Sequence, residues 1–330
     1  MRLTIIPAFC LALSVGPALA DPLYAKNLAP LAGLFGFPNL RNAQTLGAGE
    51  FSGAIHGNVA NNYSVDANAS EFVNFDVETR RFALRGAVGL GWGIDFEAEL
   101  PWLRHEGGDL DQLIENWHEF WNLPDGDRDE VPRDLIDIRF NTPDAAFALQ
   151  EEVEGWGDLN LALTKQLWSS ETAAFSLRAG AKLGTGDEDE LLGSGSEDYY
   201  LSFNASGEHR GDWPITWHGQ VGYLRAGDAD VLGDIQEQDL WFASGGMEWR
   251  TWQSVHLKLQ IDSHAEVADS SLTQLGDASV QITAGANWLF ARGWEAEFSF
   301  SEDIAVDTSP DFVLQFGLRY RLPGGRGIPD

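Results

Sequence analysis

Cysteine is nearly absent from this chain of 330 residues, in which Cys10 is the only thiol. Because Cys10 lies in an N-terminal segment that we expect to be removed, disulfides and thiolate catalysis are excluded from the mature protein. Basic residues are also scarce, since 21 Lys and Arg oppose 51 Asp and Glu and give a formal net charge of −30. This acidic balance argues against nucleic-acid binding, which requires a basic surface. No run of about 18 apolar residues follows the N-terminus, so the mature chain is expected to have no membrane-spanning helix.

The first twenty residues have the pattern of a secretory signal peptide. Arg2 gives a positive start, residues 3–15 form an apolar run without charge, and Ala18-Leu19-Ala20 is a small-x-small cleavage pattern. We therefore expect cleavage before Asp21. The alternative, an N-terminal membrane anchor, is disfavoured because the apolar run is short.

Apolar and polar residues alternate along most of the remaining chain. Val255, Leu257, Leu259 and Ile261, for example, are separated by polar residues at 256, 258 and 260. A period of two is typical of strands with one apolar and one polar face. Twelve such strands are predicted, at about 50–62, 70–88, 92–104, 156–168, 172–184, 198–209, 213–226, 238–249, 252–264, 278–289, 294–302 and 311–322.

The connections between these runs alternate in length. Short ones lie near 89–91, 169–171, 210–212, 250–251 and 290–293. Long ones lie at 63–69, 105–155, 185–197, 227–237, 265–277 and 303–310. This rhythm predicts an all-β fold, a single antiparallel transmembrane β-barrel of about twelve strands, as in outer-membrane proteins.

Tryptophan placement supports a barrel in a membrane. Seven of the 13 tryptophans lie within a residue or two of the short connections. A secreted β-sandwich or solenoid would place tryptophans in a central core, whereas indoles gathered at one edge are typical of a membrane-interface girdle. The predicted girdle consists of Trp92, Trp168, Trp213, Trp249, Trp252, Trp288 and Trp294.

The polar faces of the strands are expected to line a lumen, where charges can pair with one another and with water. We expect most of them to set the polarity of the lumen. The strand positions that we single out as pore or constriction candidates are Asp95, Glu97, Glu99, Arg178, Lys182, His256, Lys258 and Asp262. The same faces also carry Asn160, Thr216, His218, Gln220, Glu295, Glu297, Arg319 and Arg321.

The long connection at 105–155 contains the one predicted helix, at 109–123. Its apolar residues recur at helical spacing, Asp109 is a suitable N-cap, and Pro124 ends the run. We expect this helix to fold over or into an extracellular barrel mouth, where it would narrow the path and favour cations or polyhydroxylated solutes. A structural cap is the alternative. Its polar face supplies four further pore candidates, Asp111, Glu115, His118 and Glu119.

Four local motifs carry a resemblance to a known family. They are residues 22–31 with Gly36-Phe37-Pro38, residues 76–80, Leu100-Pro101-Trp102 followed by residues 105–108, and a pattern over 109–128. In these motifs the chain resembles an uncharacterised family of Gram-negative outer-membrane proteins, domain-of-unknown-function family 3187. The resemblance implies a barrel and carries no activity with it.

Residues 21–43 precede the first strand and are rich in apolar residues and proline. Left in the periplasm, this segment would expose a sizeable apolar patch. We expect it to tuck into the barrel as a plug, or else to hold a periplasmic partner. The predicted organisation is therefore a signal peptide at 1–20, a plug segment at 21–43 and a barrel at 44–330.

Catalytic and metal-binding patterns are weak. Asp262, Ser263 and His264 come nearest to a hydrolase triad, but neighbours along a strand point to opposite faces, and no G-x-S-x-G elbow occurs. The acidic residues at 187–190 and 228–234 lack the EF-hand spacing and are expected to form solvated surface. Neither an enzyme nor a cofactor is predicted.

Together these features predict a single-domain barrel in the outer membrane of a Gram-negative bacterium, with both termini periplasmic. Twelve strands enclose a space between a filled barrel and an open pore. Passage or capture of a small solute is the favoured function. A structural or adhesive barrel is the alternative, and a membrane-embedded lipid hydrolase is third. The expected partners are outer-membrane lipid and lipopolysaccharide, the latter through divalent cations because both surfaces are anionic.

This topology predicts which connections a protease reaches from outside intact cells. The loop at 105–155 should be cut, because long loops of such barrels face outward. The turns at 210–212 and 250–251 should be spared until the outer membrane is permeabilised. Cleavage at those turns in intact cells would reverse the orientation.

Overall fold

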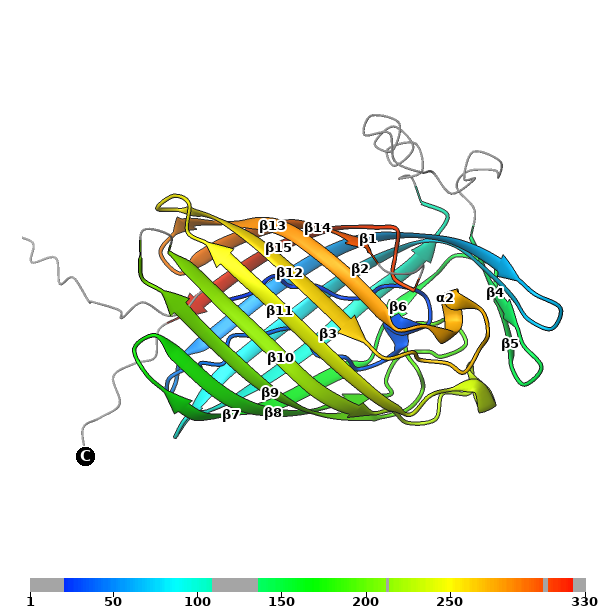
Figure 1. Ribbon diagram of the computed structural model, residues 1–330, viewed down its shortest axis with the longest axis horizontal. Coiled ribbons are helices and arrows are strands. Elements are labelled where there is room, and N and C mark those ends of the chain that lie inside the picture. Colours follow the sequence, from blue (N-terminus) through cyan, green and yellow to red (C-terminus); the bar gives the residue numbers. More distant parts are fainter. Residues whose placement is uncertain (1–20, 109–135, 212–213, 305–307, 323–330) are drawn as a thin grey trace, which may run out of the picture.

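The computed structural model of the protein describes residues 21–108, 136–211, 214–304 and 308–322. Within them, twelve long antiparallel strands form a closed ring (Figure 1). The ring closes where β15 pairs with β1, from Phe51 opposite Leu322 to Asn61 opposite Phe312. The twelve strands are β1 (Phe51–Ala67), β2 (Phe72–Gly91), β3 (Ile94–Glu106), β7 (Leu159–Ser169), β8 (Ala173–Leu183), β9 (Asp198–His209), β10 (Ile215–Arg225), β11 (Asp239–Trp249), β12 (Val255–His264), β13 (Ser279–Ala291), β14 (Trp294–Asp303) and β15 (Phe312–Leu322).

These strands confirm the predicted twelve-stranded barrel. Their bounds agree with the alternation pattern to within a few residues, and the largest difference is at the end of β1, which continues to Ala67. The strands run obliquely to the long axis of the molecule in Figure 1, as barrel closure requires. One end carries the tight turns and the other carries the long connections. We call them the short-turn end and the long-loop end.

Three short strands inside the connection at 105–155 were missed by the sequence pattern: β4 (Asp137–Asn141), β5 (Ala146–Leu149) and β6 (Val153–Trp156). β2 is longer than β3, so Phe72–Asp76 would be an unpaired edge, and β4 pairs with it. β6 pairs with β3 beyond the point where β7 leaves it. Strands of four or five residues are too short to show a clear period.

The helix predicted at 109–123 lies outside the described residues. Helical structure among the described residues consists of the 3₁₀ turns η1 (Ala32–Leu34) and η3 (Gly233–Ile235) and the four-residue helix α2 (Thr273–Gly276). None of these helices is long and apolar enough to cross a membrane.

The alternation inverts the usual burial pattern of a soluble protein. On β12, Leu257 and Leu259 face outward and are each 40 % exposed, whereas Lys258 and Gln260 face inward and are 5 % and 1 % exposed. The outer surface is therefore apolar and suited to lipid, and the interior is polar.

The turn between β2 and β3 shows how a tryptophan is placed at the short-turn end. Gly91, Trp92 and Gly93 all adopt positive φ values, of 86°, 52° and 69°. Consecutive left-handed residues form the tight hairpin turns that match strand twist. Trp92 is held at the tip of the turn and is 90 % exposed.

The outward register predicts a depth-dependent cost for arginine. Leu259→Arg, in the middle of β12, should destabilise the folded barrel by about 2–4 kcal/mol, because the charge would face the bilayer midplane. Leu322→Arg, at the short-turn end of β15, is the matched control and should cost about 0–1 kcal/mol. Reversible urea unfolding in lipid vesicles measures both values. Equal costs would contradict the placement of Leu259.

Candidate functional site

The inner wall of the barrel carries an ionic network that links β2, β3 and β8. Glu97 on β3 accepts hydrogen bonds from Arg85 on β2 at 2.6 Å and from Arg178 on β8 at 2.5 Å. Glu99 accepts one from Arg81 at 2.6 Å. These side chains meet because each points inward from its strand, and charges removed from bulk water require such partners.

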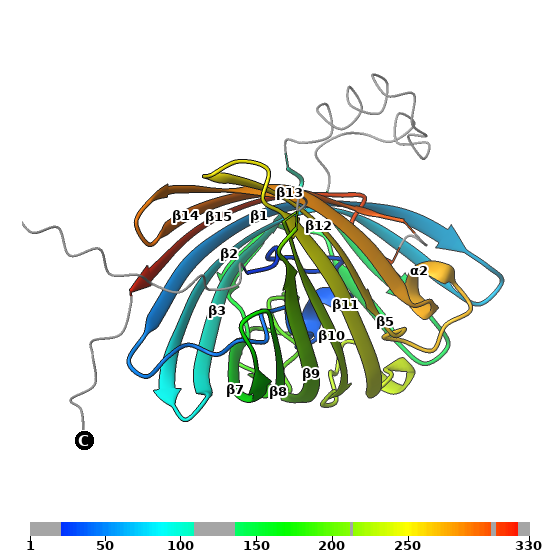
Figure 2. The ribbon, with the colours of Figure 1, turned by 60° about the vertical axis from the view of Figure 1, so that its left-hand side comes forward.

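The space inside this wall is occupied by residues 21–46, which we call the inner segment (Figure 2). Asp21 enters at the short-turn end, where it accepts hydrogen bonds from Arg319 at 2.8 Å and from Arg321 at 2.6 Å. Burial raises the pKa of Asp21, but the two guanidinium groups outweigh it and hold this pKa well below its usual range. The carboxylate therefore anchors the start of the segment.

Tyr24 contacts four strands that lie within one run of consecutive strands of the wall, β3-β2-β1-β15-β14. Its backbone N–H donates to Glu297 on β14 at 3.0 Å, and its hydroxyl donates to Glu99 at 3.0 Å and accepts from Arg81. Its ring stacks on His56 of β1, with 3.8 Å between ring centroids. The Tyr24 side chain thus contacts β1, β2 and β3, and its backbone contacts β14.

Farther toward the long-loop end, Asn27 makes a dense set of polar contacts. Its amide nitrogen lies 3.0 Å from Nε2 of His264, 3.1 Å from Oγ of Ser279 and 3.1 Å from the carbonyl oxygen of Thr308. The His264 ring also stacks on Phe37, with 4.4 Å between ring centroids. Asn27 and Phe37 flank the point where the segment reverses direction.

The reversal is packed into an apolar cluster at the long-loop end. Leu31, Leu34 and Phe35 of the inner segment are buried there together with Leu232 and Leu275 from two long connections. Apolar burial, at about 25 cal/mol per Å², stabilises this end of the segment. The long-loop end is therefore covered by an apolar cluster, in contrast to the ionic contacts at the short-turn end.

The returning arm is held mainly through its backbone. Gly36 N–H donates to Asp198 at 2.7 Å, Lys182 donates to the carbonyl oxygen of Leu34 at 2.8 Å, and Arg178 donates to that of Asn39 at 3.3 Å. Such contacts require wall side chains that reach the centre of the lumen.

Arg41 anchors the exit of the segment. Its guanidinium makes a bidentate pair with Asp95, at 3.1 and 2.8 Å, and donates to Thr164 at 2.5 Å. Leu46 N–H also donates to Asp95, and Gly49 N–H donates to the carbonyl oxygen of Gly89 just before β1 begins. The inner segment thus enters and leaves at the same end of the barrel.

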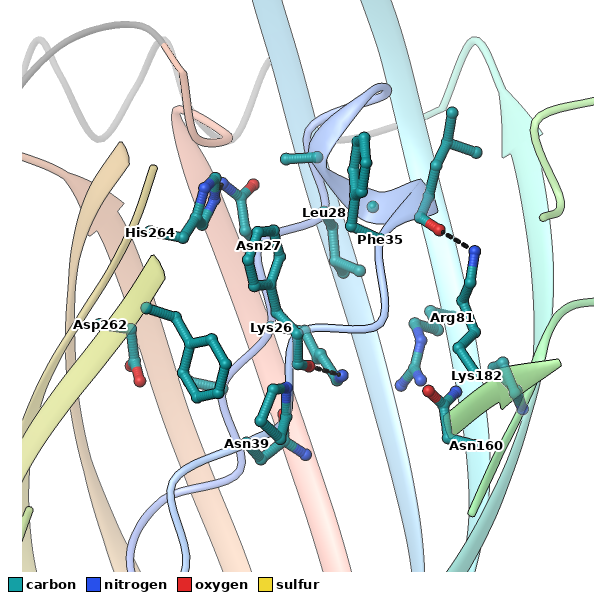
Figure 3. Close-up of a pocket in the computed structure, with 18 of the residues that line it drawn as sticks. Lys26, Asn27, Leu28, Phe35, Asn39, Arg81, Asn160, Lys182, Asp262 and His264 are labelled. Atoms are coloured by element: carbon teal, nitrogen blue, oxygen red, sulfur yellow. Dashed lines mark hydrogen bonds between the residues drawn. The ribbon is translucent and has the colours of Figure 1, made fainter. Parts of the chain in front are cut away.

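Several small cavities lie between the inner segment and the wall, and two of them are larger than the others described. One, of about 60 Å³, lies toward the short-turn end and is lined by Asp21, Arg41, Arg85 and Arg319, among others. The other, of about 90 Å³, lies farther inside and is lined by Lys26, Asp262 and residues of both arms of the segment (Figure 3). Each is large enough for several waters.

The pore candidates named from the sequence fall into three groups. Asp95, Glu99, Arg178 and Lys182 contact the inner segment directly, and Glu97 does so through Arg178. The other strand candidates lie on another part of the wall. There His256 pairs with Glu248 at 3.0 Å and Lys258 with Glu297 at 3.1 Å, while Asp262 accepts from Gln260 at 2.9 Å. Asp111, Glu115, His118 and Glu119 lie outside the described residues. A role of any of them in a pore stays a prediction.

The tryptophans of the predicted girdle lie where the short turns are. Trp92, Trp168, Trp249, Trp252, Trp288 and Trp294 are exposed on the outside at that end. Trp213 lies outside the described residues. Their contact with a membrane interface also stays a prediction.

Several residues of the site were missed by the sequence analysis. Tyr24, Lys26, Asn27 and Arg41 lie in a segment from which only the apolar residues were weighed. Arg81 and Arg85 could have been found, because they alternate with the outward Phe82 and Leu84 on a predicted strand.

Comparison with known proteins yields one family and a set of similar folds. The model of the family described as "Protein of unknown function (DUF3187)" matches residues 3–322. No curated protein matches the chain. The COG4313 outer membrane channel from Pseudomonas putida F1 aligns with a TM-score of 0.55 and 13 % identity, over 85 % of this chain and 98 % of that one. This likeness shows a shared barrel fold.

Two solved porins align more weakly. The NanC porin gives a TM-score of 0.45 and 7 % identity over 82 % of this chain and 100 % of its own. The KdgM porin gives a TM-score of 0.41 and 6 % identity over 81 % of this chain and 98 % of its own. Neither likeness bears on the site.

The position of the returning arm predicts a specific cross-link. Ala43 N–H donates to Oγ of Ser206 on β9 at 2.9 Å, so cysteines at these two positions should form a disulfide in a Cys10→Ser background. Mass spectrometry after thiol blocking should show no free thiol. The pair Ala43→Cys with Ser301→Cys, on β14, is the control and should stay reduced. Cross-linking of both pairs to a similar extent would contradict a fixed position for this arm.

Proposed function

We propose that this chain, which belongs to the family described as "Protein of unknown function (DUF3187)", is an outer-membrane channel whose lumen is closed by its own inner segment. The closed barrel, the apolar outer surface and the polar interior support a place in the outer membrane. The channel would pass or capture a small solute. The short-turn end would face the periplasm.

The re-entrant path of the inner segment carries this proposal. The segment begins beside Arg319 and Arg321 and ends beside Gly89, all at the short-turn end, while its reversal lies near the long-loop end. A chain that enters and leaves at one end can be withdrawn without threading through the barrel. It can therefore act as a removable plug.

The composition of the interior also favours a channel over a purely structural barrel. A structural barrel is stabilised best by an apolar or fully interlocked interior, because buried ion pairs add little net stability. Here Arg41–Asp95 and Asp21–Arg319 join the segment to a charged wall. Withdrawal of the segment would leave a hydrated path lined by charges.

We propose no enzymatic activity. His264 is the histidine of the triad that was considered from the sequence. Its ring nitrogens contact the Asn27 amide and the carbonyl oxygen of Ala265. This histidine is thus one of the wall residues that contact the inner segment. A hydrolase would instead need it beside a nucleophile and an acid.

Planar-bilayer recording tests the proposal. A variant lacking residues 24–43 should conduct several-fold more than the wild-type chain, because the lumen of a twelve-stranded barrel exceeds what its own side chains fill. Leu259→Ala, on the outer face, is the control and should leave conductance unchanged. A folded deletion variant that conducts no more than the wild type would rule out a plug and favour the structural or adhesive barrel.

A further inference from the structure

The larger internal cavity contains a lysine with unusual surroundings. This cavity of about 90 Å³ lies between the two arms of the inner segment and the wall. Figure 3 shows Lys26, Arg81 and Lys182 around it, with Asn160 beside Lys182 and Asp262 on the opposite side. Three basic and two acidic side chains line the cavity, the second acid being Asp158. Arg81 and Lys182 are paired with wall carboxylates, whereas Lys26 and Asp262 form no ion pair within 4 Å among the described residues.

Lys26 differs from the other basic groups of the lumen in its partners. Arg81 pairs with Glu99 at 2.6 Å, and Lys182 lies 3.2 Å from both Asp158 and Asp198. Lys26 forms no ion pair within 4 Å among the described residues. Its ammonium group donates to the carbonyl oxygen of Phe37 at 2.7 Å, which leaves two of its three N–H groups for another acceptor.

A cation in this position is costly without a counter-ion. Burial lowers the pKa of Lys26 to about 8, although Glu99 acts in the opposite direction. The hydrogen bond to Phe37 also fixes the direction of the side chain, because it joins one arm of the inner segment to the other. The group is thus preorganised, and an anion in the cavity would supply the missing charge.

The rest of the lining indicates which kind of molecule would carry the anionic group. Leu28, Phe35, Leu103 and Phe242 contribute apolar surface, and about half of the lining residues are polar, Asn160 among them. Apolar walls combined with fixed polar groups are usual in small-molecule sites. A compact organic molecule with one charged end and a part that can contact apolar side chains matches this combination.

We propose that the cavity binds a small organic carboxylate, with Lys26 as its ion-pair partner. This inference rests on the proposed channel function and names the class of solute that the channel would take. A preference for anions is opposite to the cation preference that we expect from the carboxylates at 109–123. An amine of the same shape is therefore the most informative competitor.

Isothermal titration calorimetry on the full chain in detergent tests the site, with acetate, butyrate and benzoate as probes. At least one should bind, whereas benzylamine and benzyl alcohol should not. Lys26→Met should weaken binding by about tenfold or more, because a buried charge pair would lose one partner. Lys26→Arg keeps the charge and should retain part of the affinity.

Two further variants make the result specific. Lys165→Met is the matched control, because Lys165 also donates to a backbone carbonyl, that of Trp92, but is exposed. It should bind like the wild type. Gly33→Leu should fill the cavity and abolish binding, and a Cβ there would meet no atom closer than 3.9 Å. Heat-modifiable migration on gels confirms that each barrel is folded.

The outcomes separate this inference from the channel proposal. Absence of carboxylate binding, equal binding by folded Lys26→Met, or preference for benzylamine would overturn the carboxylate site. Conductance of the same preparations is recorded independently, so a channel that conducts without binding carboxylates would keep the proposed function. Carboxylate binding by a barrel that never conducts would keep the site and overturn the channel.

Discussion

The charged inner wall imposes the constraint on which this structure depends. A closed sheet in a bilayer must pair all of its backbone groups, and the strand alternation that gives it a lipid-facing surface sends the polar residues inward. Twelve strands leave a space that these side chains do not fill. Glu97, Glu99 and Asp95 therefore need partners, and they find them in arginines of the wall and of the inner segment.

The inner segment meets this need in two different ways along its length. At the short-turn end it is held by charge, through Asp21 and Arg41. At the long-loop end it is held by apolar burial, through Leu34 and Phe35 in the cluster beneath the long connections. The two ends are thus held by different interactions. Because the ion pairs are largely buried, salt should screen them much less than it screens pairs on the surface.

Much of the fold could be predicted from the sequence because a barrel strand has a strict period. Leu259 and Lys258 differ in polarity and face opposite sides, so alternation alone set the register of β12. It could not reveal β4, because the pairing of Phe72–Asp76 depends on the unequal lengths of β2 and β3. The path of the inner segment was equally inaccessible. The sequence around Tyr24 and Asn27 shows no periodic pattern. The contacts of these two residues join positions more than 200 residues apart.

The most direct measurement is single-channel recording on the Ala43→Cys, Ser206→Cys protein, in the Cys10→Ser background, during addition of a reductant. The disulfide would hold the returning arm against β9, where Ala43 N–H lies 2.9 Å from the Ser206 hydroxyl. Conductance should be low while the bond is intact and should rise in the same molecule when the bond is reduced, as the segment regains the freedom to leave. A conductance that is already high in the oxidised state, or that does not change on reduction, would contradict a removable plug in the lumen.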